Sequence, residues 1–488
     1  MISILLLAAL SQAPSFVGMP PDSVTTQNQT YWVDGAAGSD GYDCLFPNKP
    51  CKTIQGAANK IPKNLYHDVQ VQVAAGTYAG AVFEGFTSRL PANVVTSYAG
   101  LRIQGTLGSP TLTSGTTSGT LTGYTAKSNA TMPILTDSTQ SWTVNELRGQ
   151  FVQITGGTGF PGTESAPPIY PIISNTATTL TITSFTAQAV GSTYQIVTPT
   201  TVINSFGTLA PATGTPMATP IAAGALQFIN CRGASFAVSR IRITPNATMT
   251  RGFVVGGGRV NFANVKCDIG TGGLFCFSAA LGEPTGRTQF LSSAFTASAG
   301  NTFIAISGGT NASGSMQLSG NMFYVSAGSV FGVIAGPYNV LTGSANSFFG
   351  LRTALLLDGS NYNQFVDTNI DCNNVASSTG IEARASTSNG GNGGAWAQSN
   401  SQAIINNCTV AAMRCEGNVH ALIGANTAGT GNAVGIQMLY GAKMRIPASV
   451  TLTGTVEVQL DGTGTTLATM RAASPKLINN AYGTLIYE

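Results

Sequence analysis

The sequence predicts an all-β protein whose short strands wind into a solenoid, with each coil stacked on the one before it. Only 8% of the 488 residues are charged and 59 are glycine, whereas surface helices need many Glu, Lys and Arg residues. β-Branched and aromatic residues instead alternate with small polar ones, which is typical of strands. Similar segments also begin every ~20–30 residues in the second half, and a period in this range indicates stacked repeats.

Composition and motifs exclude several functional classes. The net charge is only +3, and Lys and Arg occur singly, so we expect no nucleic-acid partner. The most obvious apolar run, Ile4–Leu10, is much shorter than the roughly 20 residues of a membrane-spanning helix. His67 and His420 are far apart and no Cys-x-x-Cys pair occurs, so we predict no metal site and no cofactor.

The N-terminal part begins with a strand, a turn and one short helix. The strand and a Gly/Asp turn are predicted at residues 31–41, YWVDGAAGSDG. The helix is indicated by apolar residues at helical spacing that end before Pro62, namely Ile54, Ala57, Ala58 and Ile61. The segments VQVQVAAGTY and AVFEGF then predict short strands joined by glycine turns. This order of parts is typical of the capped start of a solenoid.

Within residues 31–86 the chain resembles the N-terminal cap and first coils of the pectin-lyase-like right-handed parallel β-helix proteins. The matching segments are Tyr31–Asp34, Gly38–Gly41, Pro50–Ile54 and Val71–Tyr78. The resemblance implies a right-handed parallel β-helix with a short N-terminal capping helix. It leaves the activity open, because this superfamily includes lyases, hydrolases, adhesins and viral spikes, among them bacteriophage tail spikes.

The second half supports the same architecture through repeated units. Most units carry an apolar run, a Gly/Asn turn and a second, alternating run. One coil cannot bury its apolar face alone, so successive units have to stack. The units start near Arg251, Gly272, Asn301, Gly328, Arg352 and Thr379.

Between the cap and the repeats lies a segment of another kind. Its sequence indicates about five or six short strands, with a small core of Trp142, Leu147, Phe151 and Ile154. We expect a compact β-barrel-like module inserted into the solenoid, and the segment resembles a small β-module of phage tail and other virion proteins. The predicted organisation is an apolar segment at 1–30, the cap and first coils at 31–120, the inserted module at 121–199, the main β-helix at 200–394, and terminal coils and C-terminal strands at 395–488.

A few acidic residues are the candidates for catalysis. A glycosidase needs two carboxyl groups, and the chain has only 19 Asp and Glu residues. The best local group lies in LLLDGSNYNQFVDTNIDC, which contains Asp358, Asp367 and Asp371. Asp367 and Asp371 are four residues apart, so they share a face if the strand is straight. The alternative, which we favour, is that these carboxylates bind backbone groups at turns.

Aromatic residues and cysteines provide further candidates. Tyr324, Tyr338 and Tyr362 are candidate carbohydrate-binding residues, with stacking inside the coils as the alternative. Cys44 and Cys51 flank a Pro-containing turn and can form a local disulfide in an oxidising environment, with reduced thiols as the alternative. The other six cysteines lie mostly in strand-like segments and are expected to be buried thiols, namely Cys231, Cys267, Cys276, Cys372, Cys408 and Cys415.

Three functions from different classes remain. The leading hypothesis is a bacteriophage virion component, a tail spike or tail fibre with a structural role that binds host cell-surface polysaccharide. The resemblance to such viral proteins implies that three chains form a homotrimer. This homotrimer would lie in the virion tail and contact other tail proteins. The alternative is a secreted polysaccharide-degrading enzyme, a hydrolase or a lyase, against which the scarcity of acidic and basic residues argues. The second alternative is a non-catalytic surface adhesin.

The first residues, MISILLLAALSQAP, bear on the choice between virion and secretion. A secretory signal has a basic start, an apolar stretch and a small-residue cleavage site. Met1–Pro14 has the last two features, but the first basic residue of the chain is Lys49. Both interpretations stay open: an ordered anchor, which the virion hypothesis uses, and a cleaved signal.

Overall fold

The computed structural model describes residues 24–88, 100–126, 132–157, 168–183, 190–205, 224–229, 231, 233–244, 251–256, 258–269, 275–279, 287–298, 302–306, 315–326, 331–336, 340–359, 362–384, 395–397, 403–417, 419–423, 427–439, 443–446, 450–460, 465–466, 477–480 and 483–487. The segment Met1–Pro14, expected to be an anchor or a signal, lies outside these residues.

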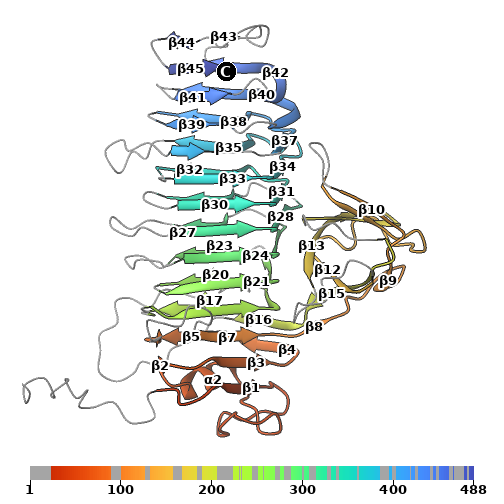
Figure 1. The fold of residues 1–488 in the computed structure, drawn as a ribbon, viewed down its shortest axis with the longest axis vertical. Coiled ribbons are helices and arrows are strands. Elements are labelled where there is room, and N and C mark those ends of the chain that lie inside the picture. The colour runs from red at the N-terminus through yellow and green to blue at the C-terminus, as the bar shows by residue number, and fades with distance from the viewer. Residues whose placement is uncertain are drawn as a thin grey trace, which may run out of the picture.

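The described chain is almost entirely β-strand and forms a tall stack of coils with a separate group of strands at one side (Figure 1). Each coil contributes one strand to each of three faces, and the strands of a face pair in parallel from coil to coil. The chain runs through the second, the first and the third face in turn. The all-β class and the stacked, solenoid-like arrangement are therefore confirmed.

The strands of each face follow one another from coil to coil. The first face contains β1 (Gln29–Val33), β3 (Val69–Val73), β7 (Gly100–Gln104), β18 (Ser235–Ser239), β21 (Arg259–Ala263), β24 (Arg287–Leu291), β27 (Ser315–Ser319), β30 (Val340–Ser344), β33 (Tyr362–Val366), β36 (Ala395–Ala397), β39 (His420–Leu422), β41 (Lys443–Ile446) and β45 (Gly483–Tyr487), and antiparallel β44 (Leu477–Asn480) ends it. The second face contains β5 (Ala81–Glu84), β17 (Gly224–Ile229), β20 (Arg251–Val255), β23 (Phe275–Ala279), β26 (Thr302–Ile306), β29 (Phe331–Ala335), β32 (Thr353–Asp358), β35 (Thr379–Arg384) and β38 (Ala411–Glu416). The third face contains β4 (Gly76–Ala79), β16 (Thr201–Ser205), β19 (Ile241–Ile243), β22 (Lys266–Ile269), β25 (Ala294–Ala297), β28 (Met322–Val325), β31 (Ser347–Phe349), β34 (Asn369–Asp371) and β37 (Ile404–Asn406).

Towards the C-terminus the second and third faces merge. The long strand β40 (Ala428–Leu439) pairs with both β37 and β38. It is followed by β42 (Thr451–Leu460), which pairs with it in parallel, and by the short antiparallel strand β43 (Thr465–Thr466).

The predicted repeats correspond to successive coils. The residues that begin the second-face strands pair in register in the order Arg251, Phe275, Thr302, Phe331, Thr353 and Thr379. Side chains of adjacent coils therefore lie about 4.8 Å apart on each face. This register decides which residues become neighbours on the surface.

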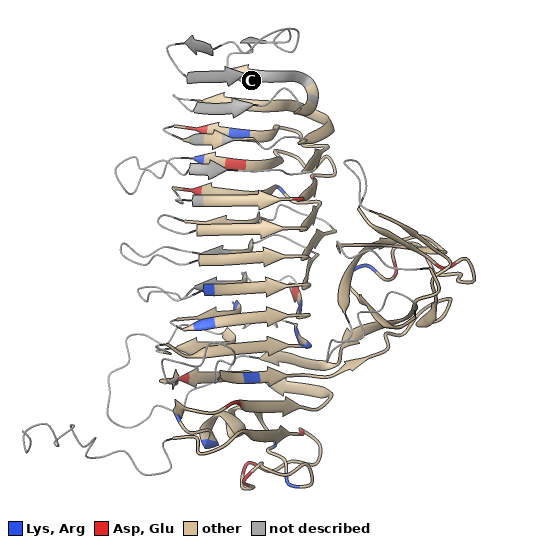
Figure 2. Cartoon of the chain, viewed as in Figure 1, with Lys and Arg blue, Asp and Glu red and all other residues tan. Residues whose placement is uncertain are grey.

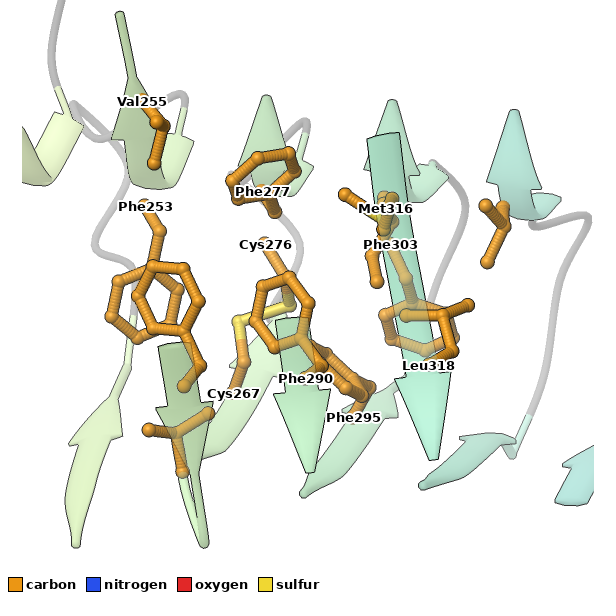
Figure 3. Close-up of a cluster of buried hydrophobic side chains, with 14 of the residues drawn as sticks. Phe253, Val255, Cys267, Cys276, Phe277, Phe290, Phe295, Phe303, Met316 and Leu318 are labelled. Carbon is orange, nitrogen blue, oxygen red and sulfur yellow. A yellow bond between two sulfur atoms is a disulfide. The ribbon is translucent and has the colours of Figure 1, made fainter. Parts of the chain in front are cut away.

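Aromatic rings fill the interior between the three faces. Phe262 and Phe290 stack with ring centroids 4.5 Å apart, and Phe323 and Phe348 do the same one face away. Figure 3 shows this core, in which Phe277 and other rings point into the space between the strands. Because equivalent positions stack from coil to coil, each buried ring covers the next, as the solenoid prediction requires.

The corner between the first and third faces uses a left-handed residue in successive coils. The non-glycine residues with positive φ at this corner are Arg240, Asn264, Ser292, Ala345 and Asp367, with angles of 44° to 57°. Asp and Asn tolerate this conformation better than most residues. Asp367 therefore lies in a corner between two strands, so Asp367 and Asp371 do not share one straight strand, and Asp367 occupies a turn as in the alternative that we favour.

A ladder of polar side chains supports the same corner from the inside. Asn321 and Asn346 are fully buried. The amide oxygen of Asn321 accepts from Ser293 N at 3.0 Å, and its Nδ2 donates to Phe290 O at 2.9 Å and to Asn346 Oδ1 at 3.1 Å. These side chains satisfy backbone groups that cannot pair within a strand at a turn.

The N-terminal cap agrees with the helix prediction. Helix α2 (Ile54–Lys60) begins after Thr53, whose hydroxyl accepts from Gly56 N at 2.8 Å. Its buried face includes Ile54, Ala57 and Ala58 and covers the end of the core. The short parallel pair of β2 (Asn64–Leu65) and β6 (Thr87–Ser88) lies in the same region. Among the described helices, none is long and apolar enough to cross a membrane.

A second sheet is inserted where the chain passes from β7 to β16. Its antiparallel strands are β8 (Leu107–Gly108), β9 (Ser118–Thr120), β10 (Gly123–Thr125), β11 (Ile134–Thr136), β12 (Phe151–Gly156), β13 (Ile169–Asn175), β14 (Thr179–Ile182) and β15 (Thr193–Pro199). We call residues 107–199 the side module. The chain leaves and returns side by side, since Thr200 N donates to Thr106 O at 2.9 Å. The module sheet thus starts before the expected residue 121.

The side module has its own core and packs on the third face. Trp142, Leu147 and Ile154 lie in the module core as expected. Phe151 does not, because it faces the solenoid and packs with Ala294 of β25. The hydroxyl of Thr183 also donates to Gly320 O at 2.7 Å. These contacts fix the module beside the stack (Figure 1).

The cysteines form more disulfides than we expected. Cys44–Cys51 is a disulfide in the N-terminal cap. Cys267–Cys276 and Cys372–Cys408 are also disulfides, and each joins consecutive coils, so the expectation of buried thiols is wrong for these four. Cys231 and Cys415 are buried thiols, as predicted.

Candidate functional site

The three candidate aspartates lie at three different corners of one coil. Asp358 ends β32 on the second face, Asp367 lies between β33 and β34, and Asp371 ends β34 on the third face. The solenoid therefore does not bring them together as a catalytic group. Sequence proximity was misleading because each corner turns the chain onto another face.

Asp371 binds groups of its own corner. Its Oδ1 accepts from Asn373 N at 2.9 Å and from the Nδ2 of Asn407, one coil further on, at 3.0 Å. This is the turn-binding arrangement that the sequence analysis favours for these aspartates.

Of the three candidate tyrosines, the structure describes the side chain of Tyr324 only. Tyr324 stacks on Phe349 with centroids 5.6 Å apart, and Arg148 of the side module lies over its ring at 4.3 Å. Tyr324 therefore takes part in the docking of the module. Tyr338 lies outside the described residues, and Tyr362 contributes backbone to β33.

Asp358 belongs to a group of charged residues on the second face. In register, Asp358 pairs with Arg384 and Arg384 with Glu416. In the neighbouring column Glu382 pairs with Arg414. We call these five residues of β32, β35 and β38 the charge lattice; Figure 2 shows acidic and basic residues on successive coils in this part of the stack.

Opposite charges alternate in the charge lattice. Arg384 Nη2 lies 3.0 Å from Asp358 Oδ2, and Arg414 Nη2 lies 3.2 Å from Glu416 Oε2. The hydrogen bond that Arg384 donates to Asp358 raises the pKa of Arg384. Partial burial lowers this pKa, and the negative charges of Asp358, Glu382 and Glu416 raise it further. Arg384 is thus the centre of three carboxylates.

Stability alone does not explain this concentration of charge. The strands β32, β35 and β38 have six residues each, so five of these 18 residues are charged, whereas charged residues make up 8% of the whole chain. Half-exposed ion pairs contribute only roughly 0–1 kcal/mol each. A rigid, partly exposed surface with both acceptors and donors is instead suited to bind a polar ligand.

The geometry is less suited to glycoside hydrolysis. Asp358 and Glu416 are two strands apart, which corresponds to roughly 9–10 Å between their backbones and is at the upper limit for an inverting pair. Arg384 lies between them and pairs with Asp358. A glycosidase instead needs space there for the glycosidic bond and a carboxyl group whose surroundings favour its protonated form.

Sequence reasoning missed most of this surface. Only Asp358 was a candidate, and Glu382, Arg384, Arg414 and Glu416 were not. The available signal was the alternation of charged and apolar residues in GIEAR and AAMRCE, but the register that aligns these strands is not visible in the sequence. Within the described residues no group of three or more His, Cys, Asp or Glu side chains is placed to hold a metal ion.

Comparisons with known proteins reveal distant structural likenesses. No protein-family model matches the chain, and no curated protein matches it. A solved structure described as a glycoside hydrolase is similar at 8% identity and a TM-score of 0.40, covering 85% of this chain and 95% of that chain. The lacto-N-biosidase of Eubacterium ramulus is similar at 9% identity and a TM-score of 0.32, covering 89% and 68%. The tailspike protein of Pseudomonas phage LKA1 is similar at 10% identity and a TM-score of 0.24, covering 82% and 70%.

Proposed function

We propose that the chain is a polysaccharide-binding component of a bacteriophage tail, of the tail spike or tail fibre type. In this proposal residues 31–106 and 200–394 form a right-handed parallel β-helix of the pectin-lyase-like kind, and three chains assemble as a homotrimer in the virion. The N-terminal segment 1–30, the side module (residues 107–199) and the terminal strands 395–488 provide the contacts with other tail proteins. The charge lattice is the observation that supports polysaccharide binding.

Sugar hydroxyls both donate and accept hydrogen bonds. Carboxylates accept them and guanidinium groups donate them in a fixed planar geometry. The charge lattice offers both kinds of group on three successive coils, with side chains such as Arg384 and Glu416 only partly buried. An extended polymer fits such a surface because the lattice repeats about every 4.8 Å along the stack.

The test is binding to a panel of immobilised bacterial surface polysaccharides. We expect the wild-type chain to bind at least one of them, and Arg384→Gln to weaken that binding at least tenfold, because Arg384 is the central donor. Arg102→Gln is the matched control, since Arg102 is an exposed arginine of the first face, with 61% of its side chain exposed. Equal binding by wild type and Arg384→Gln would remove the charge lattice from the proposal.

A secreted polysaccharide-degrading enzyme is the second candidate. The three disulfides favour it, because disulfides persist in oxidising compartments and are rare in the cytosol. Reducing-end release from the bound polysaccharide distinguishes the two. If the wild type releases reducing ends and either Asp358→Asn or Glu416→Gln abolishes this release, the enzyme is the correct assignment. If the wild type releases none, the correct assignment is binding without hydrolysis.

A further inference from the structure

A buried lysine lies where the side module meets the solenoid. Lys266, the first residue of β22, is only 6% exposed. Its ammonium group has three protons to donate, and its hydrogen bond is a long one of 3.5 Å to Gln150 Oε1 of the module. Buried charges in proteins are normally paired and hydrogen-bonded, so this ammonium group is poorly compensated.

The carboxylate of Asp268, two residues further along β22, is already engaged by other groups. Asp268 Oδ2 accepts from Arg242 Nε at 2.6 Å, and Asp268 Oδ1 accepts from the hydroxyl of Thr296. Arg242 is also the in-register neighbour of Lys266 on β19. Two cations therefore face one carboxylate, and the cluster of Arg242, Lys266 and Asp268 has a net charge of +1.

Apolar residues exclude water from one side of this cluster. Ala294, the in-register neighbour of Lys266 on β25, packs with Phe151, Ile169 and Val197 of the side module. Burial lowers the pKa of Lys266, and Arg242 lowers it further, while Asp268 only partly opposes both. The opposite side is more open, since 36% of the Arg242 side chain is exposed.

We propose that Lys266 and Arg242 form a binding site for an oxyanion, the shared chemistry of phosphate, sulfate and the carboxylate of an acidic sugar. The anion accepts hydrogen bonds from Lys266 Nζ and from the terminal nitrogens of Arg242, whose Nε is used by Asp268. It supplies the negative charge that the cluster lacks. This site is separate from the charge lattice and does not depend on the proposed function.

The site also connects the two parts of the chain. Lys266 and Arg242 belong to the solenoid, whereas Gln150, which contacts Lys266, belongs to the side module. An anion that neutralises the cluster thus stabilises the docked position of the module. Binding to the folded state alone stabilises a protein in proportion to the logarithm of one plus the ratio of ligand concentration to dissociation constant.

The test is thermal unfolding of the full chain in increasing inorganic phosphate at constant ionic strength. We expect the melting temperature of the wild type to rise and to saturate in the millimolar range. Lys266→Met lacks this saturable rise and, without phosphate, melts at or above the wild-type temperature, because an uncompensated buried charge is removed. Sodium glucuronate in place of phosphate shows whether a sugar carboxylate also binds.

Two further variants keep the test decisive. Phosphate stabilises most proteins through exclusion from their surface, so a control with the same loss of charge is needed. Lys63→Met is this control, since Lys63 lies over the ring of Phe86 at 4.0 Å, away from the proposed site. The melting temperature of Lys63→Met should rise with phosphate as that of the wild type does. Arg242→Gln should raise the phosphate concentration needed for half of the melting-temperature increase at least tenfold. This variant tests the site even if Lys266→Met fails to fold. Equal phosphate responses of the wild type, Arg242→Gln and any folded Lys266→Met would overturn the proposal.

Discussion

Replacement of Asn321 by alanine tests whether the polar ladder holds the coils together at the corner. The side chain is 0% exposed and makes three hydrogen bonds, to Ser293, Phe290 and Asn346. Each such bond contributes about 1 kcal/mol net, and buried groups left without a partner add to the cost. We therefore expect Asn321→Ala to lower the free energy of unfolding by about 3–5 kcal/mol.

The assay is urea unfolding of wild type and variant, with the midpoint and the slope fitted separately. Asn261→Ala is the matched control, because Asn261 is an exposed asparagine of β21, two coils before Asn321. Exposed substitutions of this kind change stability by about 0.5 kcal/mol or less. If Asn321→Ala lowers the free energy of unfolding no more than Asn261→Ala does, the polar ladder does not stabilise the corner as we propose.

Two further predictions concern a disulfide and a buried carboxylate. Replacing Cys372 and Cys408 by serine should lower the free energy of unfolding by about 3–4 kcal/mol, because their disulfide closes a loop with a sequence separation of 36. Urea unfolding of wild type and variant, each with and without reductant, measures this loss. If reductant destabilises the variant as much as the wild type, the prediction is contradicted. Burial by itself would raise the pKa of Asp137, but hydrogen bonds, first from Thr139 and then from Tyr194, lower it below its ordinary value. The stabilising effect of this carboxylate is therefore complete above about pH 4 and is lost as the pH falls through the lowered pKa. Asp137→Asn should be less stable at neutral pH and should lose less stability than the wild type on acidification, as measured by near-UV circular dichroism; parallel acid curves would refute this.

Local patterns predicted the elements that depend on neighbours in sequence. The alternation in Val69–Val73 appears in the structure as alternating buried and half-buried side chains. The spacing of apolar residues before Pro62 predicted helix α2. Both succeed because strand and helix periodicities act over a few residues, and the recurrence of such patterns also predicted the stack.

Contacts between coils could not be predicted in the same way. Four cysteines expected as thiols form disulfides. Stacking places Cys372 beside Cys408, whereas Cys267 and Cys276 meet where the chain passes from β22 on the third face to β23 on the second. Phe151 was assigned to the module core, although it faces the solenoid. The partner of each side chain depends on turn lengths that vary from coil to coil, and a shift of one residue turns a side chain to the other face.

By itself, the sequence determined an all-β chain with a helix at its start and coils in its second half, because hydrophobic periodicity and glycine turns act locally. Tertiary structure alone decided which charges meet. Asp367 and Asp371, close in sequence, are separated by a corner, whereas Asp358 and Glu416, far apart in sequence, both flank Arg384. The physical reason is that parallel stacking makes neighbours of residues one full coil apart, and the register of that stacking is a property of the whole core.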